Sequence, residues 1–173
     1  LAPDFKLPSL GGPTHTLGQY RGKLVVLEWF NPDCPFVKLA HGEGPLDKLP
    51  AQVKAGGGVW LAINSGGPGR QGHGKETNQR AKERFRIDYP ILFDENGKVG
   101  RTYGATNTPH IFVIAPDGKL AYAGAADNTR GGGKDSVDKI VVHPADAIAD
   151  IKAGRPVAVS SVKAWGCSVK YAK

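Results

Sequence analysis

Short runs of hydrophobic residues recur along this 173-residue chain and predict an alternating α/β protein. Nearly continuous apolar runs are typical of strands that are covered on both faces. Three such runs predict strands, at 22–30, 57–64 and 89–94. Segments with helical spacing lie between them, at 34–55 and 75–85. Gly44-Pro45 is expected to break or kink the first of these helices.

The second half of the chain predicts a short helix, a hairpin and a terminal helix. The short helix covers 97–104 and ends at Gly104, and the hairpin covers 110–124 around a Pro-Asp-Gly-Lys turn. Residues 143–154 open on a prolyl first turn and close on glycine, which indicates a helix. The order βαβαβ, then hairpin and helix, predicts a mixed sheet with helices on its faces.

Charge and composition exclude several classes of protein. The chain has 23 basic and 16 acidic residues, but the charges are dispersed. The densest cluster, at 75–86, alternates acids and bases at helical spacing and predicts a solvated helix face, so nucleic-acid binding is not expected. No run approaches the ~20 apolar residues of a membrane span. The chain lacks methionine, which favours an exported protein whose signal peptide was removed; a trimmed chain and a cytoplasmic location remain open.

A nearly complete phosphate-loop motif at 69–76 predicts no nucleotide site. Its glycines and Lys75 are in place, but Glu76 stands where the motif needs a magnesium-binding hydroxyl. A carboxylate there would repel phosphates. We therefore expect 69–76, and the glycine-rich stretch after Asn128, to be flexible surface loops.

Two cysteines, Cys34 and Cys167, are too few for a disulfide scaffold or a zinc site. Cys34 lies where a helix is predicted to begin, so unpaired N–H groups and the helix dipole would stabilise its thiolate. Lys38, one turn on, would add positive charge. A buried structural cysteine is the alternative for Cys34, and a free thiol in a frayed tail is the alternative for Cys167. Val37 excludes a dithiol within one helical turn.

Several separated motifs resemble one family. "VVLEWFNPDCPFVK" and "NTPHIFVI" resemble the two halves of a thioredoxin-fold active site. "APDFKLPSLGGPTHTLGQYRGK" resembles the N-terminal segment of peroxiredoxin-like AhpC/TSA (redoxin) proteins, and "WGCSVKY" the GCS-x-K-aromatic ending of one subgroup. The resemblance implies a thioredoxin-like three-layer α/β/α fold with a central mixed sheet, an N-terminal extension and a Cys-bearing C-terminal tail. It also implies one domain over 1–173.

The resemblance also implies roles for five residues. Cys34 matches the attacking cysteine and Pro109 the cis-proline that faces it. Thr108 would offer backbone groups to a bound thiol or peptide. Glu28 matches the buried acid that moves protons in thioredoxins, although a sheet-end carboxylate in water is an alternative. Cys167 would resolve the intermediate that Cys34 forms.

Two departures put peroxidase activity in doubt. The peroxidase motif P-x-x-x-[ST]-x-x-C would need Pro at 27 and Ser or Thr at 31, where this chain has Leu27 and Asn31. Asn31 could donate a hydrogen bond in place of the hydroxyl, and Arg130 is the candidate that would polarise a peroxide. The sequence therefore favours disulfide exchange over peroxide reduction.

The leading hypothesis is a thiol oxidoreductase in which Cys34 attacks a disulfide or a peroxide. Its partners would be a protein or low-molecular-weight thiol reductant, and no cofactor or metal is expected. The resemblance also allows a homodimer, because peroxiredoxin-like proteins often dimerise. One alternative is a non-enzymatic binding or accessory module with a structural Cys34–Cys167 disulfide. Another is a copper carrier that uses Cys34 with His41 or His110.

Overall fold

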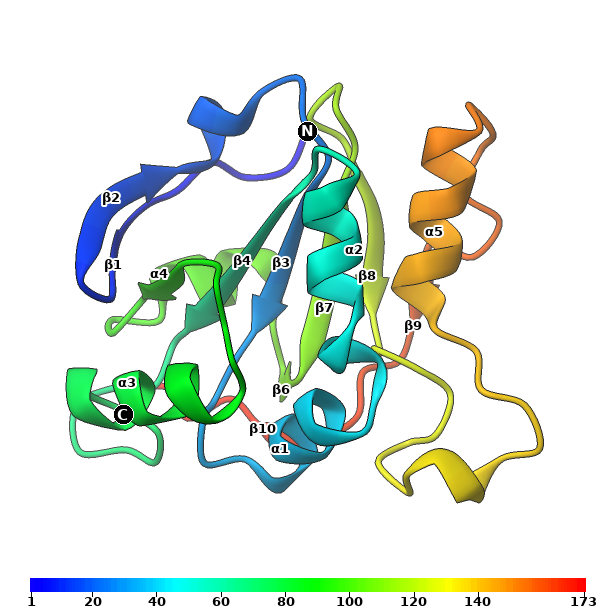
Figure 1. The fold of residues 1–173 in the computed structure, drawn as a ribbon. Helices are drawn as coiled ribbons and strands as arrows, with labels where there is room; N and C mark the ends of the chain where they lie inside the picture. Colours follow the sequence, from blue (N-terminus) through cyan, green and yellow to red (C-terminus); the bar gives the residue numbers. More distant parts are fainter.

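The computed structural model describes residues 1–173 and contains an eight-stranded sheet flanked by helices (Figure 1). The strand order is β2-β1-β5-β4-β3-β7-β8-β9. These strands are β1 (Lys6–Ser9), β2 (Gly12–Thr16), β3 (Val25–Trp29), β4 (Val59–Asn64), β5 (Ile91–Phe93), β7 (His110–Ile114), β8 (Leu120–Gly124) and β9 (Ser161–Val162). A separate two-stranded sheet pairs β6 (Asn107–Thr108) with β10 (Cys167–Ser168).

Five α-helices accompany the sheet: α1 (Pro35–Gly42), α2 (Leu49–Ala55), α3 (Lys75–Arg84), α4 (Lys98–Tyr103) and α5 (His143–Lys152). Short 3-10 turns lie at Leu17–Tyr20, Pro45–Asp47 and Lys134–Ser136. None of the helices has the length and apolar character needed to cross a bilayer.

Strand β3 lies at the centre of the sheet, as its apolar run predicts. It pairs in parallel with β4 and antiparallel with β7, and all five of its residues are buried. Glu28 lies opposite Ala62 on one side and Ile111 on the other. The predicted hairpin adds β7 and β8 as antiparallel strands, so the sheet is mixed.

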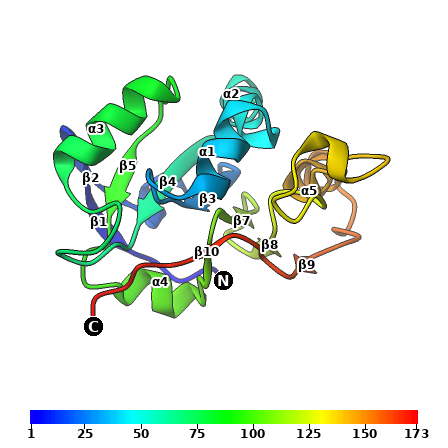
Figure 2. The ribbon, with the colours of Figure 1, turned by 90° about the horizontal axis from the view of Figure 1, so that it is seen from below.

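Hydrophobic side chains form a core on each face of the sheet. One core gathers residues of α1, α2, α3 and α5 against the sheet, and Cys34 belongs to it. The other core lies between the sheet, α4 and the N-terminal segment. The helices thus cover both faces, which is the predicted three-layer thioredoxin-like arrangement (Figures 1 and 2).

The predicted 34–55 helix is divided at Gly44-Pro45, as expected. A Cβ at Gly44 would lie 2.7 Å from Ala40 Cα, so only glycine fits where the chain turns back on α1. Pro45 opens the following 3-10 turn, and Pro50 occupies the first turn of α2. Proline is tolerated there because the N–H groups of a first turn have no partner within the helix.

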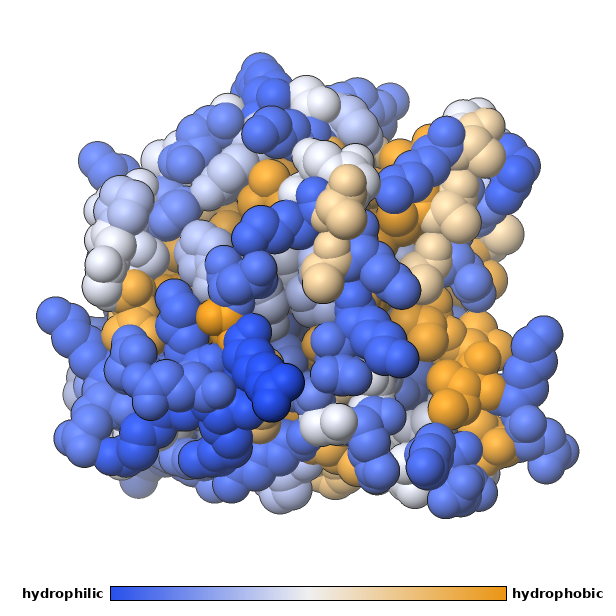
Figure 3. All heavy atoms as spheres, viewed as in Figure 1, coloured by the Kyte–Doolittle hydropathy of each residue, from blue (hydrophilic) through white to orange (hydrophobic).

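The exposed face of the charged helix α3 was predicted correctly, but the loop before the helix is more ordered than predicted. Only Asn78 and Ala81 of α3 are buried, and Figure 3 shows a hydrophilic surface over this helix, as the charge pattern predicts. The preceding loop is less free than its glycines suggested. Asn64 and Asn78 both donate side-chain hydrogen bonds to Gly72 O, at 2.9 and 3.0 Å.

The two ends of the chain form strands that the pattern did not predict. Residues 6–16 fold into the β1–β2 hairpin, and β1 joins the edge of the sheet at β5. At the other end, β9 pairs with β8 and β10 with β6. These strands are short and lack alternation, so their partners rather than their own sequences define them.

Candidate redox site

Cys34 and Cys167 lie together although 133 residues separate them. Their Sγ atoms are 2.8 Å apart, and both cysteines are free thiols. Cys34 is 0% exposed at the start of α1, whereas Cys167 is partly exposed on the tail. Figure 2 shows the tail crossing between α1 and α4. The structure therefore brings together the two cysteines whose contact the sequence left open.

Backbone pairing next to the proline holds Cys167 over Cys34. Cys167 pairs with Thr108 in the β6–β10 sheet. The preceding Gly166 has φ +125°, and a Cβ there would lie 2.2 Å from Thr108 O. Asn107 Nδ2 donates to Gly166 O at 3.0 Å. Only glycine lets the tail approach this closely.

Further contacts anchor the tail on both sides of Cys167. On the near side, Trp165 Nε1 donates to Asp127 O at 2.8 Å. On the far side, Tyr171 Oη donates to Ala105 O at 2.7 Å, and the Arg101 guanidinium lies 4.5 Å above the Tyr171 ring. The tail is thus fixed at both ends of the cysteine.

The surroundings of the two thiols differ in which protonation state they favour. Burial raises the pKa of Cys34, but hydrogen bonds from Cys167, the Thr108 side chain and the N–H groups of Val37 and Cys167 outweigh it, and the net direction is down. Burial and the adjacent Cys34 raise the pKa of Cys167 to about 11. A single negative charge shared by the pair therefore resides on Cys34.

Thr108 and Pro109 face Cys34 as expected. The Thr108-Pro109 peptide bond is cis, and Cys34 Sγ donates to Thr108 O at 3.3 Å. The Thr108 hydroxyl is buried and forms no hydrogen bond in the structure, so its proton is free to be donated to a thiolate. The Cys167 side chain and this hydroxyl both lower the pKa of Cys34. Thr108 thus offers an acceptor to the thiol and a donor to the thiolate.

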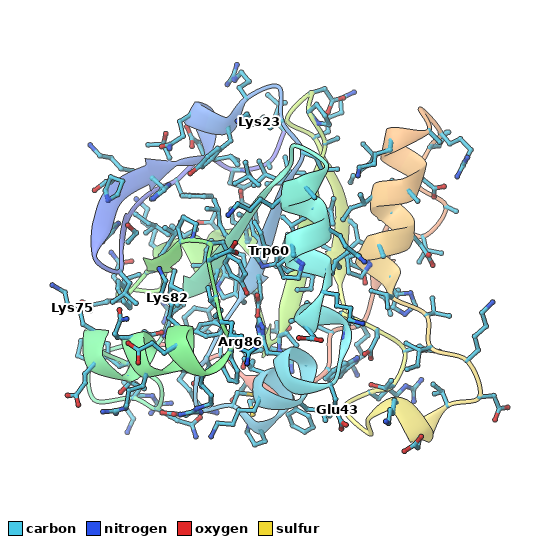
Figure 4. The ribbon with its side chains drawn as sticks, viewed as in Figure 1. Lys23, Glu43, Trp60, Lys75, Lys82 and Arg86 are labelled. Atoms are coloured by element: carbon cyan, nitrogen blue, oxygen red, sulfur yellow. The ribbon has the colours of Figure 1, made fainter.

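Glu28 is fully buried, so the alternative of a sheet-end carboxylate in water is wrong. His41 Nε2 lies 2.7 Å from Glu28 Oε1. Trp60 Nε1 and Tyr89 Oη donate to Oε2 at 3.0 and 3.4 Å. Figure 4 shows Trp60 beside α2, the helix that covers this network. No hydrogen bond joins the network to Cys34, and proton transfer by Glu28 stays a prediction.

The three secondary candidates do not bond to either sulfur. The Asn31 side chain donates to Gln71 Oε1 at 3.1 Å and accepts from Asp33 N at 2.9 Å. Lys38 and Arg130 are exposed, and their side chains form no hydrogen bond or ion pair. The structure therefore gives Cys34 hydroxyl and backbone donors rather than a positively charged side chain.

The histidines proposed as copper ligands point elsewhere. His41 contacts Glu28, and His110 stacks on Phe112 with ring centroids 4.5 Å apart. Burial lowers the pKa of His110 to about 4, so its ring is neutral at pH 7. No cluster of three or more His, Cys, Asp or Glu side chains has the geometry to hold a metal ion. The structure therefore does not gather Cys34 and these two histidines into one ligand set.

Sequence reasoning missed the partners of Glu28 and the residues that dock the tail. Trp60 and Tyr89 lie on separate strands or loops, and no local pattern links them to Glu28. For the tail, the signal was Gly166 directly before Cys167, because glycine marks a place where two backbones approach closely. Trp165 was visible in the same motif but had no assigned partner.

A thioredoxin-like fold with two facing thiols defines the class of protein, and comparison with known proteins gives its family. Residues 1–123 match the model of the AhpC/TSA family, so the chain belongs to that family. It is 35% identical over 121 residues to the thiol-disulfide oxidoreductase ResA of Geobacillus thermodenitrificans. That match covers 69% of this chain and 64% of the relative, less than two thirds of its length.

Solved structures confirm the fold over nearly the whole chain. A hypothetical protein of Sinorhizobium meliloti 1021 aligns with a TM-score of 0.81 and 28% identity, covering 99% of this chain and 92% of its own. The thioredoxin domain of a thiol-disulfide oxidoreductase from Bacteroides vulgatus aligns with a TM-score of 0.58 and 21% identity, over 71% and 84% of the two chains. The first alignment includes the Cys167 tail, which lies beyond the family match.

Proposed function

We propose that this protein is a thiol-disulfide oxidoreductase whose redox centre is the Cys34–Cys167 pair. The observation that carries the proposal is the 2.8 Å separation of two free sulfurs beside a cis-proline. The pair supplies the two electrons that convert one external disulfide into two thiols, and the reverse reaction restores them. Similarity to ResA, itself named a thiol-disulfide oxidoreductase, supports the same chemistry.

Disulfide exchange fits the site better than peroxide reduction. Cys34 is fully buried, and Asn31 already uses its amide to bind Gln71. Arg130 is exposed and bonds to no other side chain. A peroxide would thus find neither an open path to the sulfur nor the donors that polarise its O–O bond.

The proposed partners are a protein or low-molecular-weight thiol reductant and a disulfide substrate. We also propose that 1–173 fold as one domain, because the tail contributes Cys167 to a site built by the rest of the chain. An exported location and a homodimer are further proposals; cell fractionation and sedimentation would test them.

The test is to mix oxidised protein with dithiothreitol, and reduced protein with either glutathione disulfide or hydrogen peroxide, and to count free thiols over time. We expect rapid reduction by the dithiol and faster oxidation by the disulfide than by peroxide. A disulfide that resists millimolar dithiol would instead identify a structural clasp and an accessory module. Variants Cys34→Ser and Cys167→Ser are the matched controls, since neither can form the internal disulfide.

A further inference from the structure

The two sulfurs of the redox pair differ in access. Cys34 is 0% exposed and belongs to the main hydrophobic core, whereas Cys167 is partly exposed. Cys34 Sγ lies 2.8 Å from Cys167 Sγ and 3.3 Å from Thr108 O. An external thiol therefore has access to the residue Cys167 but not to the buried residue Cys34.

The direction of attack reinforces this difference. A thiolate displaces a disulfide sulfur along the line that extends the S–S bond. Attack on Cys34, with Cys167 leaving, must reach a residue that is 0% exposed and packed in the hydrophobic core. Attack on Cys167, with Cys34 leaving, must reach a residue that is partly exposed. The closed site therefore favours the second approach over the first.

Opening the site to expose Cys34 would require the tail to separate from the rest of the protein. That movement breaks the β6–β10 pairing together with the Trp165–Asp127 and Tyr171–Ala105 hydrogen bonds. Reaction at Cys167 needs none of these contacts to break. Cys34 is also the better leaving group, because the more acidic thiol departs faster from a disulfide.

We propose, on the basis of the function above, that Cys167 rather than Cys34 forms the mixed disulfide with external thiols. In the reductive direction, an external thiolate attacks Cys167 Sγ and a new S–S bond forms between them. The Cys34–Cys167 bond breaks, and its electron pair remains on Cys34 as a thiolate. A second thiolate of the reductant then attacks the first reductant sulfur, and Cys167 leaves and takes up a proton.

The oxidative direction is the reverse. Cys167 gives its proton to the Cys34 sulfur 2.8 Å away and attacks one sulfur of a client disulfide; the client S–S bond breaks, and the other client sulfur leaves as a thiolate. Cys34 then attacks Cys167 Sγ in the mixed disulfide, and the client's second sulfur leaves with the proton that Cys34 releases. Cys34 is therefore the resolving cysteine, which inverts the order expected from the sequence.

Tryptic mapping tests the proposal on the wild-type chain. Oxidised protein is treated briefly with reduced glutathione, quenched with acid and labelled with N-ethylmaleimide. The two cysteines fall in separate tryptic peptides, residues 24–38 and 164–170. We expect glutathione on 164–170 and maleimide on 24–38, with the opposite labelling about tenfold rarer or less. Glutathione on 24–38, or an equal mixture, would overturn the proposal.

The single-cysteine variants keep the proposal testable if the disulfide proves inert. Such inertness would overturn the proposed function, but Ellman's reagent would still report access in the reduced state. We expect folded Cys34→Ser, which retains Cys167, to react about tenfold faster than folded Cys167→Ser, and the ratio to approach unity in guanidinium. The lower pKa of Cys34 would by itself make Cys167→Ser the faster variant. A faster reaction of Cys34→Ser must therefore come from the greater solvent exposure of Cys167. A faster reaction of folded Cys167→Ser would contradict it.

Discussion

Cys167 pairs with Thr108 in the β6–β10 sheet, and the Thr108 carbonyl accepts a hydrogen bond from Cys34. Thr108 thus contacts both cysteines. Its backbone pairs with Cys167, and its carbonyl oxygen and hydroxyl face Cys34. The arrangement of the redox pair depends on this contact because Thr108 holds the tail through backbone pairing and also bonds to Cys34. The site is therefore sensitive to changes at Thr108 and at Gly166, the tail residue that lies against it.

Removing the Thr108 hydroxyl should destabilise the Cys34 thiolate relative to the thiol without disturbing the backbone. In a Cys167→Ser background, we expect Thr108→Val to raise the pKa of Cys34, because the thiolate loses a donor. The ultraviolet absorbance of the thiolate against pH measures this change. Thr102→Val is the matched control, since that exposed hydroxyl bonds only within α4. An unchanged titration in Thr108→Val would show that the hydroxyl does not act on Cys34.

Gly166→Ala should release the tail, because its Cβ would lie 2.2 Å from Thr108 O. Gly154→Ala is the control, since Gly154 also has positive φ but open space around it, and should cost only about 1–2 kcal/mol. We expect Gly166→Ala to lose more stability than the control in urea titration and to make Cys34 reactive toward Ellman's reagent. Equal behaviour of the two variants would mean that the close approach is unimportant for docking.

Glu28→Ala should destabilise the fold strongly, because it leaves His41, Trp60 and Tyr89 without their buried acceptor. Each buried hydrogen-bonding group that is left without its partner costs about 1–3 kcal/mol. The exposed Glu76→Ala, which breaks a surface pair with Arg80, should cost about 0.5 kcal/mol. Urea denaturation compares the two free energies of unfolding, and similar losses would contradict the structural role of Glu28.

His110 should make the fold acid-sensitive. Burial lowers its pKa from 6.5 to about 4, so the unfolded chain binds a proton first as the pH falls. The stabilising difference is present above pH 6.5 and is lost between pH 6.5 and about 4, amounting to about 3 kcal/mol. We expect His110→Asn to reduce the pH dependence of the free energy of unfolding between pH 6.5 and about 4. Urea titrations measure this free energy at each pH, and each protein is compared with its own value at pH 7. An identical slope in wild type and variant would contradict the assignment.

The sequence predicted the elements whose own pattern decides their structure. Strand β3 is apolar at nearly every position, and Gly44-Pro45 can only interrupt a helix, so both were predicted correctly. The β1–β2 hairpin and the two-residue strands β9 and β10 depend on distant partners, and no local pattern marked them.

The part of the site that lies in the two thioredoxin-like motifs could be predicted from the sequence. Cys34, Thr108 and Pro109 were identified from motifs, and the structure places them together. The contact with Cys167 could not be derived from sequence, because it depends on where the tail crosses the fold. The relative exposure of the two thiols depends on the same crossing, which is why the expected order of attack placed Cys34 first.

The most direct test of the account is the reduction potential of the Cys34–Cys167 pair. The protein is equilibrated in glutathione and dithiothreitol redox buffers of graded composition, alkylated, and analysed by mass for the fraction oxidised. We predict a two-electron transition between about −270 and −120 mV, the range of catalytic thiol-disulfide oxidoreductases. A potential below about −300 mV would instead identify a structural disulfide and contradict the proposed redox cycle.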